Sequence, residues 1–308
     1  AAADAVERAL GCPLEVAAAA TETLLRDPHP AVRATAVAWL RHLDSAPAGI
    51  RRYLADLPCE SGEMPSQAQA DAWAQRVTDG LIERYPADLD QPPPVTFTMA
   101  TALLTRVAWY EPFDVVAASE LGPGPFADSL NRAMQARVGR GHRAMIVASP
   151  IGPVAVHEAV ADGLVVTSVA ADPAVPTAEV IDAAYAIAAG RPQAVSLWDL
   201  PLGDGPAWTI TEGREPAHGE RGERILDVTV PAWSAQDTHD LLRLPGKGGF
   251  AAAGQLLAPL LGRTEFDTEA AQAVAARYHR TGFEAAVITA LAVRGAALPP
   301  RQEVPVRT

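Results

Sequence analysis

The sequence predicts a mixed α+β fold in a single domain, rich in helices near its start and rich in strands behind. Three observations support that prediction. Residues 282–294 alternate with the period of 2 that a half-buried strand shows, and residues 95–109 form an apolar run typical of a central strand. Before residue 84, apolar residues recur instead at helical spacing.

The first 57 residues are expected to be helical. Apolar residues keep a spacing near 3.6 from residue 10 to residue 25, where two prolines follow and stop the helix. A second helix is predicted over Ala31–Leu43, with Trp39 and Leu40 on its apolar face. Beyond a loop, Gln67–Arg84 has the pattern of an amphipathic helix, and Ser66 is placed to cap it.

Strands dominate the rest of the sequence. Val95–Trp109 contains a single charged residue, Arg106, so this strand is expected in the middle of a sheet with both faces covered. Short strands are predicted at residues 145–147, 154–159 and 164–169, the last two joined by a hairpin turn at Asp162-Gly163. Glu269–Tyr278 fits either a strand or a helix.

Composition narrows the classes of partner. The protein has 308 residues, a net charge of −12 and a pI of about 5.0, and an acidic surface argues against a nucleic-acid partner. No apolar run reaches the length of a membrane helix. Cys12 and Cys59 are expected to be free thiols in a reducing cytoplasm, although the sequence starts without Met and secretion stays open.

Motifs for catalysis or cofactors are incomplete. His157-Glu158 starts a zinc-protease pattern whose second histidine would fall at Ala161, and Gly246-Lys247 lacks the other residues of a phosphate loop. We therefore expect no cofactor, no metal and no catalytic residue. A small-ligand or anion site is a weaker hypothesis for His157 and for the basic turn with Arg140, His142 and Arg143, whereas a structural histidine is the simpler interpretation of His157.

The segment after Thr281 alternates in a specific way. One set of positions holds most of the larger apolar groups, namely Phe283, Ala285, Val287, Thr289, Leu291 and Val293. The other set holds both charges, namely Glu284, Ala286, Ile288, Ala290, Ala292 and Arg294. The pattern is that of a strand, while the glycine and prolines that follow indicate an exposed segment.

Several stretches, in order, resemble the serpin family. Trp73 followed by Thr78-Asp79-Gly80-Leu81-Ile82 is similar to the helix and Thr-Asn-Gly-x-Ile turn that precede the central serpin strand. Val95 to Phe113 resembles that strand and its Trp-x-x-Pro-Phe ending, with Trp109 as the tryptophan. Residues 225–233, 240–242 and 260–262 follow the serpin order of strand, Pro-x-Phe, helix and Leu-Gly.

The last of these stretches is the alternating segment itself. It matches the serpin hinge Gly-Thr-Glu-Ala-Ala-Ala-Ala-Thr at Gly282, Glu284, Ala285, Ala286 and Thr289. The resemblance implies one serpin-like domain over residues 1–308, with three β-sheets, eight or nine helices and a hinge and reactive-loop region at 281–301. It also implies a metastable fold, in which a protease cleaves the loop and the hinge enters the large sheet as a new strand.

Several positions depart from the family pattern. Phe283 replaces a small residue and is expected to raise the barrier to insertion or block it by overpacking, and the bulkier Val287 and Ile288 replace alanines. Thr101 stands where the family has Asn in its central strand. The two core strands that end a serpin are absent from this sequence, so a cleaved C-terminal peptide is a possible second chain.

Two functions remain open. The first is a bacterial serine protease inhibitor with its scissile bond at Ala296–Ala297, which would suit an elastase-like protease. The second is a non-inhibitory serpin-like scaffold that binds a small molecule or a partner, or that catalyses a step in a bacterial biosynthetic pathway. The target, the ligand, the state of the loop and the oligomeric state cannot be obtained from the sequence, and the balance favours a protein that is not an enzyme.

Overall fold

A computed structural model describes residues 2–122, 124–190, 193–213, 222–243, 248–259, 261 and 267–295. The protein forms two compact units: unit 1 contains residues 1–106, 234–277 and 284–308, and unit 2 contains residues 107–233 and 278–283. Whether the two units fold together as the single domain expected from the sequence stays a prediction.

Unit 1 is built on a six-stranded sheet of order β12-β13-β14-β3-β1-β2. Its strands are β1 (Val32–Leu40), β2 (Glu60–Glu63), β3 (Val95–Ala108), β12 (Trp233–Asp240), β13 (Asp267–His279) and β14 (Gly282–Arg294). Its helices are α1 (Ala2–Leu10), α2 (Leu14–Arg26), α3 (Ala48–Asp56), α4 (Gln67–Val77) and α7 (Gly248–Leu257), with a short 3-10 helix η1 (Leu43–Ser45).

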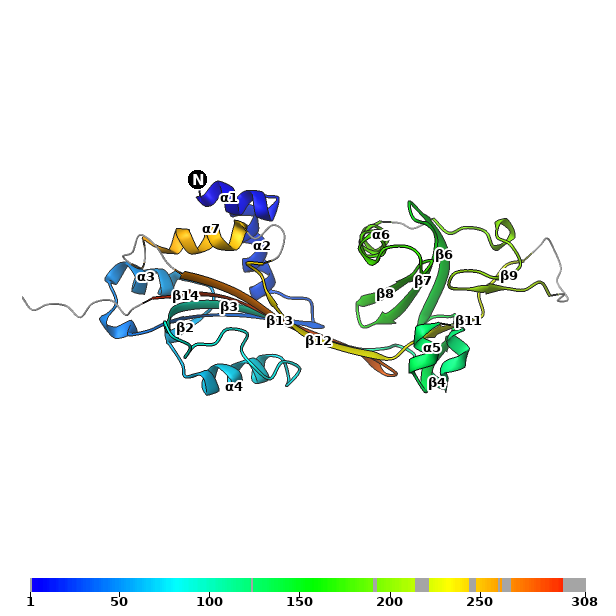
Figure 1. The fold of residues 1–308 in the computed structure, drawn as a ribbon, viewed down its shortest axis with the longest axis horizontal. Coiled ribbons are helices and arrows are strands. Elements are labelled where there is room, and N and C mark those ends of the chain that lie inside the picture. The colour runs from blue at the N-terminus through cyan, green and yellow to red at the C-terminus, as the bar shows by residue number, and fades with distance from the viewer. Residues whose placement is uncertain are drawn as a thin grey trace, which may run out of the picture. The chain divides into compact units, whose positions relative to one another are not determined.

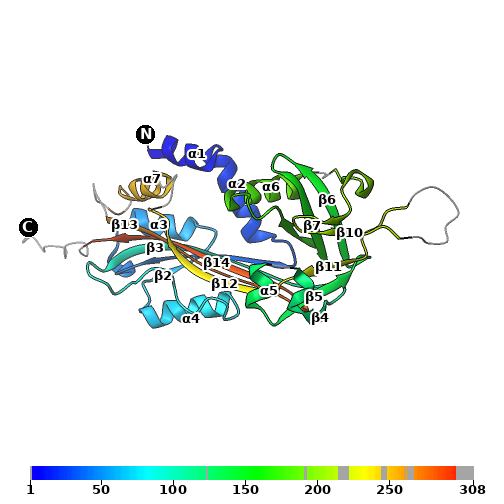
Figure 2. The ribbon, with the colours of Figure 1, turned by 45° about the vertical axis from the view of Figure 1, so that its right-hand side comes forward.

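The alternating segment is the strand β14, and it lies in the middle of this sheet. Figures 1 and 2 show it running between β13 and β3. Thr98 of β3 contacts Leu291 and Thr96 contacts Val293, so β14 and β3 run antiparallel. A tight turn at Arg280-Thr281 joins β13 to β14 as a hairpin. The choice between strand and helix for residues 269–278 is thus settled in favour of a strand.

Helices cover both faces of the sheet within unit 1. On one face, α4 packs Ala70, Trp73 and Ala74 against alanines of the central strands. On the other face, Ile50 and Leu54 of α3 and Leu257 of α7 pack against a second cluster that includes Phe97. Figure 1 shows α4 on one side of the sheet and α3 and α7 on the other. The doubly covered sheet explains why β3 has apolar residues on both of its faces.

One predicted helix is wrong. Residues 32–40, predicted as part of a helix over Ala31–Leu43, form the strand β1, which pairs antiparallel with β3 and parallel with β2. Val37, Ala38, Trp39 and Leu40 are all buried, because both faces of β1 are covered at that end. A run that is apolar at consecutive positions does not distinguish a buried strand from a buried helix.

The helix before the central strand ends as its sequence requires. Ser66 and Gln69 form a reciprocal capping box at the start of α4, which ends at Val77 and not at Arg84. Asp79 and Gly80 follow with φ of 50° and 77°, the left-handed region that glycine and Asn or Asp adopt most easily. The buried Thr78 hydroxyl donates to the Ala74 carbonyl and accepts from the Ile82 amide, which fixes the turn.

Unit 2 contains three smaller sheets. Their strands are β4 (Asp114–Ala117), β5 (Arg132–Arg137), β6 (His142–Ser149), β7 (Gly152–Ala161), β8 (Leu164–Ala170), β9 (Gly203–Asp204), β10 (Thr209–Ile210) and β11 (Asp227–Val230). The orders are β11-β5-β4, β6-β7-β8 and β10-β9, and the predicted Asp162-Gly163 hairpin joins β7 to β8. The helices are α5 (Pro125–Ser129) and α6 (Thr177–Ala189), with 3-10 helices η2 (Ala118–Leu121) and η3 (Leu197–Asp199).

The predicted α+β class is confirmed. The described residues contain seven α-helices where the family resemblance implied eight or nine, and four sheets where it implied three. Within those same residues, no helix is both long enough and apolar enough to cross a membrane.

Candidate functional site

The first residue of β14 is a glycine that the packing requires. A Cβ atom at Gly282 would lie 2.2 Å from the carbonyl oxygen of Val107 on β3, far closer than any real contact. The obstacle is a backbone atom, and the backbone does not rotate away as the end of a flexible side group does. Gly282 therefore lets β14 approach β3 closely enough to begin pairing.

Phe283 is accommodated in the strand. It is half-buried, and its ring lies 6.3 Å from both Trp233 and Tyr278. These aromatic neighbours surround the Phe283 ring where it lies in the strand. The expected effect of Phe283 on insertion, a raised barrier or a block, stays a prediction.

The two alternating sets face different surroundings. The set with the charges is the more buried one: Ala286, Ile288, Ala290 and Ala292 are at most 5% exposed and pack in the cluster that α4 covers. Ala285 and Val287, of the other set, line an apolar groove of about 360 Å³. Small side chains on the α4 side let the helix approach the sheet closely.

A series of alternating charges attaches the start of β14. The Arg106 guanidinium on β3 donates to Glu284 at 2.8 Å and pairs with Asp79 at 3.1 Å, and Asp79 also pairs with Arg33. The hydrogen bond from Arg33 is the main cause that lowers the pKa of Asp79. Because these groups are partly exposed, each pair contributes only about 0.2–1 kcal/mol.

Hydroxyl groups attach the second half of the strand. Thr289 accepts a hydrogen bond of 2.9 Å from the Gln272 amide on β13. On the β3 side, Thr98 and Thr96 donate to the carbonyls of Leu291 and Val293 at 3.1 and 3.0 Å. Thr98 is fully buried and also bonds the Tyr85 hydroxyl at 2.9 Å, and burial strongly raises the pKa of Tyr85.

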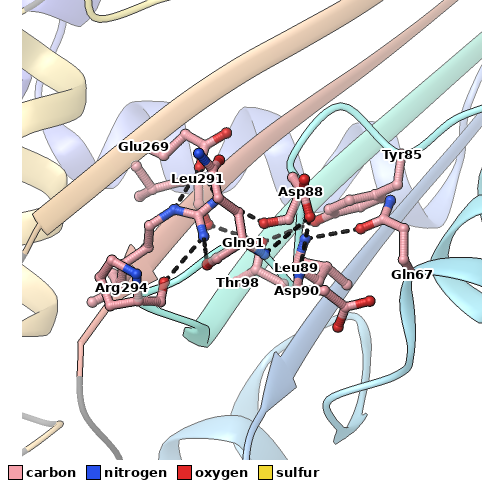
Figure 3. Close-up of polar contacts among 12 residues, drawn as sticks. Gln67, Tyr85, Asp88, Leu89, Asp90, Gln91, Thr98, Glu269, Leu291 and Arg294 are labelled. Atoms are coloured by element: carbon pink, nitrogen blue, oxygen red, sulfur yellow. Dashed lines mark hydrogen bonds and ion pairs between the residues drawn. The ribbon is translucent and has the colours of Figure 1, made fainter.

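The last residue of β14 is a buried arginine. Arg294 is 7% exposed, and its guanidinium contacts the Glu269 carboxylate of β13 and backbone carbonyls of the segment that leads into β3 (Figure 3). β14 is thus attached by side chains at its start, middle and end. The sequence predicts the strand but none of these side-chain attachments. Partners such as Glu269 and Gln272 depend on the register of the hairpin, which the sequence does not give.

The two predicted fold-supporting residues occupy different settings. Trp109 is buried in unit 2, where its indole N–H donates to the His279 carbonyl at 2.8 Å and its backbone N–H donates to the Thr281 carbonyl at 3.0 Å. It therefore holds the β13–β14 turn. Thr101 pairs with Ala36 of β1, and its side chain is exposed.

The speculative ligand residues separate into two pairs. His142 and His157 are buried, stacked with ring centroids 5.3 Å apart, and joined by a hydrogen bond of 3.1 Å between His142 Nδ1 and His157 Nε2. Arg140 and Arg143 are exposed, and Arg143 pairs with Glu158 at 3.1 Å across β6 and β7. The structure joins the histidines in a core and leaves the arginines at the surface.

The expected scissile bond, Ala296–Ala297, lies outside the described residues, as does the rest of the reactive-loop region beyond Gly295. At the last described position, the Gly295 N–H donates to the Pro94 carbonyl at 3.4 Å.

Among comparisons with known proteins, only solved structures match this chain. No family model and no curated protein matches the sequence. Among solved structures, thyroxine-binding globulin complexed with thyroxine-fluorescein matches with a TM-score of 0.61 and 14% identity, covering 96% of this chain and 85% of that one. Reaction-loop-cleaved lamprey angiotensinogen matches with a TM-score of 0.58 and 10% identity, with the same two coverages of 96% and 85%.

A third solved structure, the viral serpin CrmA, matches with a TM-score of 0.53 and 12% identity, over 87% of this chain and 84% of that one. The protein has a serpin-like fold. This agrees with the resemblance found in the sequence. The largest sheet among the described residues is the six-stranded one, and β14 is one of its inner strands. At such identities the likeness shows the fold, and the activity has to be inferred from the residues.

Proposed function

We propose that this serpin-like protein is a serine protease inhibitor that acts by reactive-loop cleavage and insertion. A protease cleaves the polypeptide at a bond beyond the end of β14, and residues 282–294 then enter the sheet between β13 and β3. The observation that carries the proposal is the place of β14: the segment that resembles a reactive-loop hinge is a central strand, antiparallel to both neighbours.

The side chains of β14 support the proposal because they suit both an exposed and an inserted segment. Gly282 permits the close approach to Val107, and alanines fill most positions that face α4. Glu284 and Arg294 would be hydrated in an exposed loop, and in the sheet they form ion pairs with Arg106 and Glu269. A segment with larger residues at the buried positions would insert with difficulty.

The length of β14 gives the mechanism its reach. Thirteen residues of strand extend about 40 Å, from the Val107 end of β3 to the Pro94 end. A protease held as an acyl-enzyme on the new C-terminus would be carried over that distance, because the start of β14 stays joined to β13 by the turn. Distortion of the attached protease would then stop hydrolysis of the acyl bond.

The direct test is incubation of the full-length protein with elastase-like and trypsin-like serine proteases. We expect a covalent complex that survives SDS with at least one protease, and a rise in Tm of the cleaved protein. A protease whose active-site serine is replaced by alanine is the control, since it cannot form the acyl bond.

Cleavage without any complex, together with an unchanged Tm, would contradict the proposal. That result would favour the second candidate, a non-inhibitory scaffold that binds a small molecule. The groove of about 360 Å³ beside Ala285 and Val287 is the specific observation for it, and the fold likeness to thyroxine-binding globulin is compatible with it.

A further inference from the structure

The guanidinium of Arg294 is satisfied completely. Nε donates to Glu269 at 2.8 Å, and Nη2 donates to Glu269 and to the Asp88 carbonyl, the latter at 2.6 Å. Nη1 donates to the carbonyls of Gln91 and Pro93 at 2.9 and 3.2 Å. All five N–H groups of the side chain therefore have an acceptor, which is the full capacity of an arginine.

The acceptors are held by contacts that do not involve Arg294. The Asp88 carboxylate accepts from the amides of Asp90 and Gln91, both at 3.1 Å, which fixes the turn that presents the carbonyls. The Leu89 amide donates to Gln67 of α4 at 2.8 Å (Figure 3). These contacts hold the segment between α4 and β3 without using any residue of β14.

Only arginine has the chemistry for these acceptors. Its planar fork presents five donors in fixed directions, while a lysine ammonium has three donors at one point. Four oxygen atoms surround the Arg294 guanidinium: one carboxylate oxygen and three carbonyl oxygens. A neutral side chain would leave the Glu269 carboxylate without its buried partner, which is unfavourable.

We propose that Glu269 and the carbonyls of Asp88, Gln91 and Pro93 form a guanidinium-binding site whose ligand is Arg294. Arg294 is a positioning residue: it holds the C-terminal end of β14 in the sheet once the strand has entered. The inference rests on the proposed function in that the site fills only when β14 inserts. It adds that the gain in stability on insertion depends on the side chain at position 294.

The test measures Tm of the intact and the loop-cleaved protein for wild type, R294Q and R294K. We expect both substitutions to lower Tm of the cleaved form by about 5–10 °C, because the Glu269 carboxylate and the three backbone carbonyls lose hydrogen bonds from the guanidinium. Tm of the intact form should stay unchanged if its loop is exposed. Arg277, an exposed arginine on β13, is the matched control, and R277Q should change neither value.

The change in Tm on cleavage is the deciding readout, since a residue with a general structural role would shift both forms equally. The double variant E269Q/R294Q should recover part of the loss, because no unpaired carboxylate remains. Where cleavage raises Tm of wild type, an R294Q protein that gains as much Tm on cleavage would overturn the guanidinium site.

The failures of the two proposals can be separated. If wild type forms no protease complex and gains no Tm on cleavage, the inhibitory function fails. If R294Q then lowers Tm of the intact protein where R277Q does not, β14 is a permanent strand and the guanidinium site stands. If R294Q changes neither form, the site itself is disproved.

Discussion

At the scale of the residue, two buried histidines of unit 2, His142 and His157, are in contact. His142 Nε2 lies 2.7 Å from the Glu111 carbonyl and must donate to it, and His142 Nδ1 shares a hydrogen bond of 3.1 Å with His157 Nε2. His157 Nδ1 is then left buried without a hydrogen-bond partner. Burial, with a smaller effect of His142, lowers the pKa of His157 from 6.5 to about 4.

This arrangement predicts a loss of stability in acid. The pKa of His157 is lower in the folded protein than in the unfolded state, so the stabilisation is present above pH 6.5 and is lost as pH falls toward 4. The loss is on the order of 3 kcal/mol. Urea unfolding of H157Q should show a weaker dependence on pH than wild type between pH 6.5 and 4. Equal pH dependence in the two proteins would refute the assignment.

Residue identity alone does not reveal this pair. His157 is a candidate because it falls in an apolar strand pattern, and His142 because it falls in a basic turn. Their contact depends on the β6–β7 register, in which Ala144 pairs with His157 and His142 with Ala159. The turn between β6 and β7 sets that register, and the sequence of the turn does not predict the register clearly enough to pair the two histidines.

At the scale of the element, β14 has one tightly packed face and a second face that borders a groove only near Ala285 and Val287. Ala290 is fully buried under α4, whereas Ala285 borders the groove on the opposite face. The period of the sequence predicts the strand but not which set faces α4. The larger apolar residues lie on the face with the groove, and mostly small residues fill the face that α4 covers.

A matched pair of substitutions tests this division. A290L adds volume where no space exists and should lower the free energy of unfolding by about 1–3 kcal/mol. A285L adds the same volume beside the groove and should change it by less than about 0.5 kcal/mol. Equilibrium denaturation in urea measures both. Equal effects of the two substitutions would show that β14 is not packed in this orientation.

Other elements show where sequence patterns fail. The apolar residues that recur in residues 32–40 predict a helix, yet the segment pairs with β3 along its whole length. The prediction of helix α4 is correct because its cap and its spacing agree, and the Thr78-Asp79-Gly80 turn ends it. Local signals suffice where a cap or turn is present, and long-range pairing decides the rest.

At the scale of the molecule, the α+β class and the serpin-like fold could be predicted from a few ordered stretches. The hinge match at Gly282, Glu284, Ala285, Ala286 and Thr289 identifies the strand at the centre of the site. The attachments of that strand could not be predicted, since Arg106, Gln272 and Glu269 come from other strands. The position of β14 in the sheet is therefore the point on which the proposed function depends.

Amide hydrogen exchange over residues 282–294, measured before and after cleavage at a bond beyond Arg294, tests that point most directly. A central strand bonded on both sides exchanges slowly, and an exposed segment exchanges quickly. The account predicts fast exchange in the intact protein and strong protection of Ala286–Ala292 after cleavage. Exchange over this segment that cleavage leaves unchanged would contradict it.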